Sequence, residues 1–241
     1  MSRADALPPL REGGLRSALR AAAFDFYYQS IRLVPANILW GIAFLAVLAF
    51  GVGGGPISTL LVCPLLAIPY VGVVRLAAST ARGHDVVLSD VWRAYRRFGL
   101  PALGVGVAVT LGVALLGSNI VAGAAAGSFF GWAFATLAGS GLLAIWVLSF
   151  PLWILMVDPE RDERPLRDRL RLAVLVVLAA PGRMALLSLV LTIILLVSTV
   201  AFAALLTISV SFTSLVAARY VLPLADRLEG WLETRNEAAA S

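Results

Sequence analysis

The chain has 241 residues, of which 60% are hydrophobic and 14% are charged. In ordinary soluble domains about 45–50% of the residues are hydrophobic and about 25% are charged. This composition therefore excludes a soluble domain and favours a polytopic membrane protein. The net charge of +5 comes from 19 arginines, without lysine, against 14 carboxylates. Because the arginines flank apolar segments and alternate with acids, we expect the lipid bilayer, and no nucleic acid, as the partner of this basic chain.

Every charged side chain lies in one of four blocks, which are residues 1–32, 75–97, 158–183 and 219–237. The stretches between these blocks carry no charge: 33–74, 98–157 and 184–218. A soluble protein meets water along its whole length and therefore scatters its charges. The segregation predicts that most of this chain lies in hydrocarbon.

The first 34 residues are predicted to be a cytoplasmic N-terminal segment with an amphipathic helix. Met1 to Gly14 lack the apolar core of a cleavable signal peptide, so we expect the first hydrophobic span to remain as a membrane helix. The next 42 residues, 33–74, contain the turn signal Gly51-Val52-Gly53-Gly54-Gly55-Pro56. A span needs about 20 apolar residues, so this stretch predicts two helices, near 36–53 and 57–78.

The second stretch, 98–157, has small residues near its centre and predicts spans near 101–121 and 129–156. The third, 184–218, has 35 residues and neither Gly nor Pro, so either two short spans or one long tilted helix would fit its length. Arginines stand on both sides of it, and the positive-inside rule keeps both ends in the cytoplasm. An even number of crossings follows, and we predict spans near 184–202 and 204–222.

The predicted fold is an all-α membrane protein with six transmembrane helices as three hairpins and with cytoplasmic amphipathic interfacial helices. The bundle covers residues 35–222, and residues 223–241 form a cytoplasmic amphipathic tail. The predicted outward loops contain no arginine. We therefore expect a multi-pass membrane protein with both termini in the cytoplasm.

Two interfacial helices are predicted on the cytoplasmic side, near 88–98 and 166–180, each with one apolar face and several arginines. In the first, we predict a contact with a partner or with lipid headgroups through Trp92, Arg93, Arg96 and Arg97. Pro35, Pro101 and Pro181 each follow such a segment and are expected to open a hairpin. This order indicates a three-fold repeat, although any six-span protein with short loops would show three hairpins.

The charge-free stretches contain none of the ionisable side chains that proton-coupled carriers and intramembrane hydrolases use. We therefore expect that the protein is not an enzyme and that it binds neither a cofactor nor a metal ion. His84, the single histidine, is expected in a solvated loop, and the lone Cys63 in packing. The run 158–163 alternates acids with arginine and lacks the glycine of a calcium loop, which predicts a solvated loop held by salt bridges.

Three segments resemble the bacterial YesL-like family of integral membrane proteins: Asn37-Ile38-Leu39-Trp40, Gly55-Pro56-Ile57-Ser58-Thr59 and the aromatic-basic run from Asp90 to Phe98. The resemblance covers mainly residues 24–105. It implies an inner-membrane protein of several spans, often encoded near carbohydrate-uptake genes, with no established activity. After the Gly-Pro pair the family has a small residue and then Ala-Leu-Tyr, whereas this chain has Leu60-Leu61-Val62.

The leading hypothesis is a non-enzymatic accessory component of a membrane system, with a link to carbohydrate uptake. Its partner would be a membrane protein or an ATPase on the cytoplasmic face. One alternative is a permease subunit of an ATP-driven importer, since residues 93–101 resemble the end of the coupling loop of such permeases. The other is a lipid-interacting protein whose arginines bind anionic headgroups.

Overall fold

The computed structural model describes residues 14–240, so the first 13 residues of the predicted N-terminal segment lie outside the described part. Within that part the chain is almost entirely helical and contains no strand, as predicted. Six of its helices are long and apolar enough to cross a membrane, which matches the predicted number of spans.

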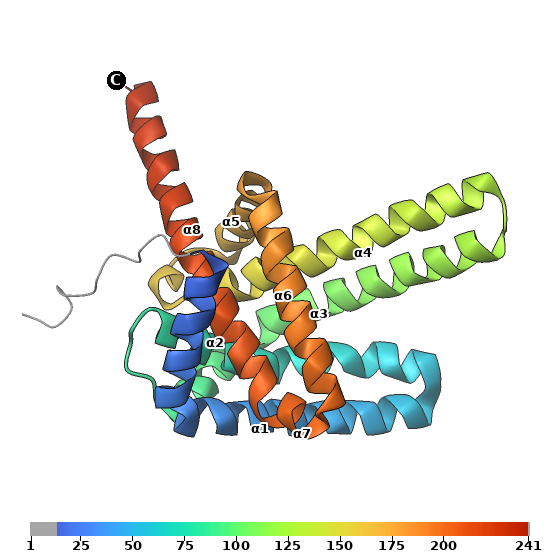
Figure 1. Cartoon of the computed structure of the whole chain (residues 1–241), viewed down its shortest axis with the longest axis horizontal. Coiled ribbons are helices and arrows are strands. Elements are labelled where there is room, and N and C mark those ends of the chain that lie inside the picture. Colours follow the sequence, from blue (N-terminus) through green and yellow to red (C-terminus); the bar gives the residue numbers. More distant parts are fainter. Residues whose placement is uncertain (1–13, 241) are drawn as a thin grey trace, which may run out of the picture.

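The first two apolar helices are the two parts of α1 (Leu15–Val62), and the second part continues through the short 3-10 helix η2 (Cys63–Leu66) into α2 (Ala67–Ala81). Gly55 has φ 76° and ψ −170°, which interrupts α1 just before Pro56 and confirms the predicted turn signal. No break separates the N-terminal amphipathic segment from the first span, because α1 is continuous from Leu15. Figure 1 shows that α1 changes direction along its first half.

The second pair consists of α3 (Leu88–Ala125) and α4 (Phe129–Met156), which run side by side (Figure 1). The turn between them contains Gly127 with φ 61°, and the Ser128 hydroxyl then accepts a hydrogen bond from the Gly131 N–H at 3.1 Å and caps α4. The bounds of α4 agree with the predicted span at 129–156. The predicted interfacial helix at 88–98, in contrast, is the first part of α3 and not a separate helix.

The last part of the chain begins with η3 (Pro159–Arg161) and α5 (Leu166–Ala179), which lies where the second amphipathic helix was predicted. α6 (Pro181–Val200) follows, and the chain reverses at Ala201, where φ is −95° and ψ is 72°. The short helix α7 (Phe202–Ala204) and the π-helical segment η4 (Leu205–Ser209) lead into α8 (Val210–Ala240). The stretch 184–218 therefore forms parts of two helices and not one long helix.

A buried asparagine of α1 stabilises this reversal. Asn37 has no exposed surface, and its amide donates to the Leu205 carbonyl oxygen at 3.2 Å while its side-chain oxygen accepts from the Ser211 N–H at 2.7 Å. The Ser211 hydroxyl donates to the Leu33 carbonyl oxygen at 3.0 Å. The two bonds of Asn37 hold backbone groups at either end of the π-helical segment, and the Ser211 bond joins the start of α8 to α1.

The prolines differ in their positions. Pro181 is the first residue of α6, as predicted. Pro35 lies inside α1 and Pro101 inside α3. The expectation that a proline opens every hairpin is therefore wrong at these two positions, because each amphipathic segment continues as one helix into the span behind it.

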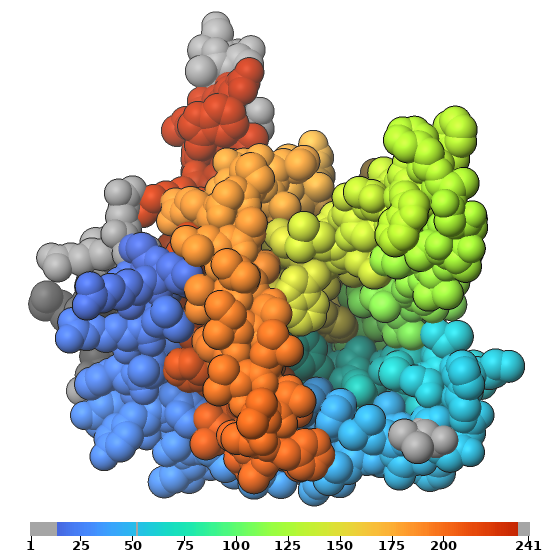
Figure 2. Space-filling model, turned by 45° about the vertical axis from the view of Figure 1, so that its right-hand side comes forward, coloured from blue at the N-terminus to red at the C-terminus, as the bar shows by residue number. Residues whose placement is uncertain are grey.

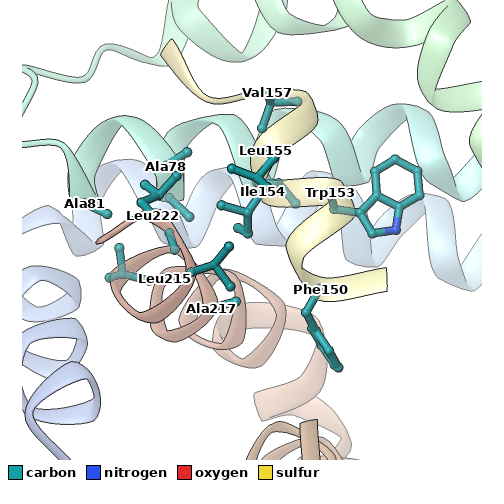
Figure 3. Close-up of a cluster of buried hydrophobic side chains, with 14 of the residues drawn as sticks. Ala78, Ala81, Phe150, Trp153, Ile154, Leu155, Val157, Leu215, Ala217 and Leu222 are labelled. Carbon is teal, nitrogen blue, oxygen red and sulfur yellow. The ribbon is translucent and has the colours of Figure 1, made fainter. Parts of the chain in front are cut away.

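The hydrophobic core lies where the end of α4 meets α2 and α8 (Figure 3). Figure 3 shows Ile154 and Leu155 of α4 among Ala78 of α2 and Leu215 of α8. Toward the turns between paired helices the apolar side chains become exposed, for example Phe130 at 82% and Val200 at 91%. Large exposed apolar surfaces at helix ends without charge are typical of membrane-facing surfaces.

Candidate functional site

The start of α3 is fixed by Asp90. The Val87 N–H donates to the Asp90 carboxylate at 2.9 Å, and the Asp90 N–H donates to the Val87 carbonyl oxygen at 2.8 Å. An acid in the first turn also interacts favourably with the helix dipole. The resulting helix buries Val91, Ala94 and Phe98 and turns the intervening side chains outward.

Three of the four predicted contact residues form an exposed surface on the first turns of α3. Trp92 is 59% exposed, and the Arg96 guanidinium lies 5.6 Å from the centre of its ring. The Tyr95 ring meets Trp92 edge-on at 6.2 Å between ring centres. The Arg93 side chain, 73% exposed, forms an ion pair with Asp90 at 2.5 Å. We call Trp92, Arg93 and Arg96 the α3 surface patch.

The fourth residue, Arg97, lies against the segment between α4 and α5. Its guanidinium donates to the Asp162 carbonyl oxygen at 2.6 Å and to the Asp162 carboxylate at 3.3 Å. Arg75 of α2 binds the same carboxylate with two hydrogen bonds, at 2.6 and 2.7 Å, and also donates to the Val157 carbonyl oxygen at 2.7 Å. Asp162 therefore links α2 and α3 to the segment after α4.

These two arginines belong to a cluster around a buried phenylalanine. The guanidinium carbons of Arg75, Arg97 and Arg169 lie 5.7, 5.4 and 5.5 Å from the centre of the Phe98 ring. Cations over an aromatic face are attracted by its negative quadrupole. We call these four residues and Asp162 the Phe98 cluster, which holds the start of α3 against α2 and α5.

Arg169 of α5 has the least favourable electrostatic position in the Phe98 cluster. Burial lowers the pKa of the Arg169 guanidinium, Asp162 opposes this shift, and the like charges of Arg97 and Arg75 lower the pKa further. Its guanidinium donates to the Met156 carbonyl oxygen. The Arg169 Nε is buried without a hydrogen-bond partner.

A second group of charges, the ionic network, joins the C-terminal ends of α2 and α4 to the middle of α8. The buried guanidinium of Arg82 bonds to Asp158 at 2.8 Å and to Asp226 at 2.7 Å. Arg161 bonds to Asp158 as well, to Asp226 at 2.7 Å and to Glu229 at 2.6 Å. Asp158 has no exposed surface, and the side chains of Arg82 and Arg161 are 4% and 3% exposed.

The carboxylates keep both buried guanidiniums charged. Burial alone would lower the pKa of Arg82 and Arg161, but hydrogen bonds to Asp226 and Asp158 for the first, and to Glu229 and Asp226 for the second, outweigh it and raise both pKa values. Both side chains therefore remain cationic at neutral pH. Such a network is costly to break, because removal of one partner leaves an uncompensated buried charge.

The prediction of a solvated loop at 158–163 is therefore half wrong. The salt bridges are present, but Asp158 and Arg161 are buried. The reason lies far away in the sequence, since α2 supplies Arg82 and α8 supplies Asp226 to cover this segment. The only signal in the sequence was the spacing of three between Asp226 and Glu229, which puts both carboxylates on one helical face. That spacing does not identify the arginines that these carboxylates bind.

A polar recess of about 320 Å³ lies beside the Phe98 cluster. Its charged lining residues are Arg75, Arg93, Arg97, Asp85, Asp90 and Asp162. Acids and arginines balance there, so the recess has no net preference for an anion. His84 also lines it and is exposed, as predicted. Among residues 14–240, no three His, Cys, Asp or Glu side chains are grouped in a way that could hold a metal ion.

The segment 93–101, which resembles the end of a permease coupling loop, lies inside α3, with Pro101 within the helix. It forms no separate helix between two spans. The geometry is therefore that of one continuous helix that carries an exposed patch.

The six apolar helices, with charged groups gathered at the ends remote from the tight turns, define a multi-pass integral membrane protein. Comparison with protein-family models, with curated proteins and with solved structures finds no match for this chain. The arguments about function therefore depend on the chemistry of the described residues.

Proposed function

We propose that the protein is a non-enzymatic accessory component of a membrane system in the bacterial inner membrane, and that it binds a protein partner through its cytoplasmic face. In this proposal both termini lie in the cytoplasm, together with the ionic network and the Phe98 cluster. The expected link to carbohydrate uptake depends on the resemblance to the YesL-like family.

The observation that carries the proposal is the α3 surface patch. Trp and Arg are enriched among the residues that dominate binding energy at protein interfaces. Here an exposed Trp92 and the stacked Arg96 stand on a helix whose opposite face is held by Phe98. Such a support limits the conformational entropy that an interface must lose on binding.

The proposal is tested by purification in mild detergent from cells that express the tagged protein. The variant Trp92→Ala should lose a partner that the unchanged protein retains. Trp132→Ala is the matched control, because Trp132 is also 59% exposed but lies at the other end of the α3–α4 pair. A protein that purifies alone, or two variants that behave alike, would contradict the proposal.

A second function, binding of anionic lipid headgroups, is supported by the same pairing of Trp92 with Arg96. Tryptophan and arginine are the side chains that favour the membrane–water interface. Replacement of Arg93, Arg96 and Arg97 together by Gln should abolish selective retention of phosphatidylglycerol over phosphatidylcholine in native mass spectra. Replacement of three exposed arginines elsewhere, Arg16, Arg20 and Arg167, makes the same change in net charge and should preserve the selectivity.

A further inference from the structure

A groove of about 530 Å³ lies between the α3–α4 pair and the helices α6 and α8. Figure 2 shows the surface hollowed between α6, in orange, and α4, in yellow and green. Its residues belong to the apolar helices: α1 and α2 contribute Trp40 and Tyr70, α3 and α4 contribute Val109 and Trp146, and α6 contributes Leu195. The groove is therefore at bilayer depth if these helices span the membrane.

Three polar side chains of the groove form hydrogen bonds within the protein. The Ser149 hydroxyl donates to the Ile145 carbonyl oxygen at 2.7 Å, and the Thr213 hydroxyl donates to the Ser209 carbonyl oxygen at 2.8 Å. The Trp146 indole N–H donates to the Thr192 hydroxyl at 2.8 Å, across the gap between α4 and α6. What the groove offers to a ligand is mainly carbon surface with several aromatic rings.

We propose that this groove binds one acyl chain of a bilayer phospholipid. Its volume is in the range of about 300–1,000 Å³ that is usual for small-molecule sites. A sugar would need several free hydrogen-bonding groups, and a bound water would need about two to four polar partners. The lining is mostly apolar and offers few such groups. A partner helix, with a diameter of about 10–12 Å, has a cross-section of about 80–110 Å², so the groove would hold only about one turn of it, whereas an unbranched chain is narrow and flexible.

The surroundings supply this ligand. A groove lined with carbon loses dispersion contacts if it stays empty, and lipid tails are the abundant apolar molecules at that depth. The Trp146–Thr192 hydrogen bond ties α4 to α6 beside the groove. The site differs from the α3 surface patch, so its test does not depend on the proposed partner.

The test compares two valine variants of α3 in native mass spectra of the detergent-purified protein with dioleoyl phosphatidylethanolamine. Val109 lines the groove, whereas Val107, two residues earlier, is 40% exposed and lies outside the lining. Val109→Phe should weaken retention of one lipid about tenfold, because the larger ring displaces about two methylene groups of the chain. Val107→Phe should retain the lipid as the unchanged protein does.

If Val109→Phe does not fold, Val113→Phe makes the same increase in side-chain volume one turn further along α3 and should give the same loss. Equal retention by the Val107 and Val109 variants would overturn the proposal. So would a groove that retains free oleate or a long-chain isoprenol but no phospholipid. If the Val109 variant changes only the ratio of monomer to dimer, the groove is an interface with a second copy of the chain, and the proposal is overturned as well.

Discussion

Asp158 has no exposed surface and accepts hydrogen bonds from Arg82 and from Arg161, two guanidiniums that are themselves almost fully buried. Its carboxylate is therefore the shared partner of two cations from different parts of the chain. Asp226 and Glu229 complete the neutralisation from α8. Loss of the Asp158 charge would leave the positive charges of the two buried guanidiniums incompletely neutralised.

The substitution Asp158→Asn tests this argument at the residue scale. We expect it to lower the free energy of unfolding by about 3–5 kcal/mol, the usual cost of removing one partner of a buried ion pair. The measurement is the unfolding temperature in detergent. Glu163→Gln removes one negative charge from the same segment at an exposed position and should change stability by less than about 0.5 kcal/mol. Equal effects of the two substitutions would show that the ionic network does not stabilise the fold.

The close packing of α3 on α2 and η2 depends on a glycine. A Cβ atom at Gly106 would lie 2.8 Å from the Ala67 Cβ and 3.0 Å from the Pro64 carbonyl oxygen. The second of these neighbours is backbone and cannot move without shifting η2. At Gly104, two residues earlier in the same helix, a Cβ would meet no atom within 4 Å.

These two glycines give opposite predictions for the same substitution. Gly104→Ala should stabilise the protein by up to about 1 kcal/mol, because alanine has the higher helix propensity. Gly106→Ala should destabilise it by about 1–3 kcal/mol through overpacking. The unfolding temperatures of the two variants in the same detergent should therefore move in opposite directions. A rise in both would mean that α3 and η2 are farther apart than the structure places them.

The third helix pair reverses close to the predicted position, between spans 184–202 and 204–222, although no local residue marks the turn. The first turn carries Gly55-Pro56 and the second carries Gly127, residues whose backbone preferences are local. The third reverses at Ala201 and in a π-helical segment, where the sequence has no Gly or Pro. Its stabilising partner is Asn37, more than 160 residues away, and only charge at the two ends indicated an even number of crossings.

Asn37→Leu tests this long-range stabilisation. The side chain keeps a similar size, but the Leu205 carbonyl oxygen and the Ser211 N–H lose their partner, at about 1–3 kcal/mol for each unsatisfied group. We expect a lower unfolding temperature and faster hydrogen exchange in residues 205–211. Asn119→Leu, a half-buried position in α3, is the control and should alter neither. If exchange in 205–211 is unchanged, the π-helical segment is stable without Asn37.

The sequence predicted the class of fold because hydrophobicity and charge are properties of whole segments. The six spans and the bounds of α4 were predicted in this way. The Phe98 cluster and the ionic network were not predicted, since they bring Arg75, Arg82 and Arg169 together with residues of other segments. The continuity of α3 through Pro101 was also missed, because one proline with helical neighbours is compatible with a bend or a straight passage.

At the scale of the whole molecule, the buried charges and the core lie together at one end of the helices. The ionic network joins α2, α4 and α8 there, and Arg219 of α8 pairs with Asp25 of α1 at 2.5 Å. At the turns, the side chains are mostly apolar and exposed, as for Phe129 at 81%. The molecule is therefore fixed at its charged end, whereas the opposite ends of its helices are held mainly by their neighbours and by lipid.

This asymmetry predicts the orientation in the membrane. Arginines stay on the side where they are synthesised, so the charged end should face the cytoplasm and the turns should face outward. In a Cys63→Ala background, Ser118→Cys, near the end of α3 that we expect to face outward, should react with an impermeant thiol reagent in intact cells. Ser89→Cys, at the start of the same helix, should react only after the membrane is permeabilised. Both serines are exposed and lie on one helix, so the reverse labelling pattern would mean that the protein has the opposite orientation. Labelling of both in intact cells would show that α3 does not cross the bilayer.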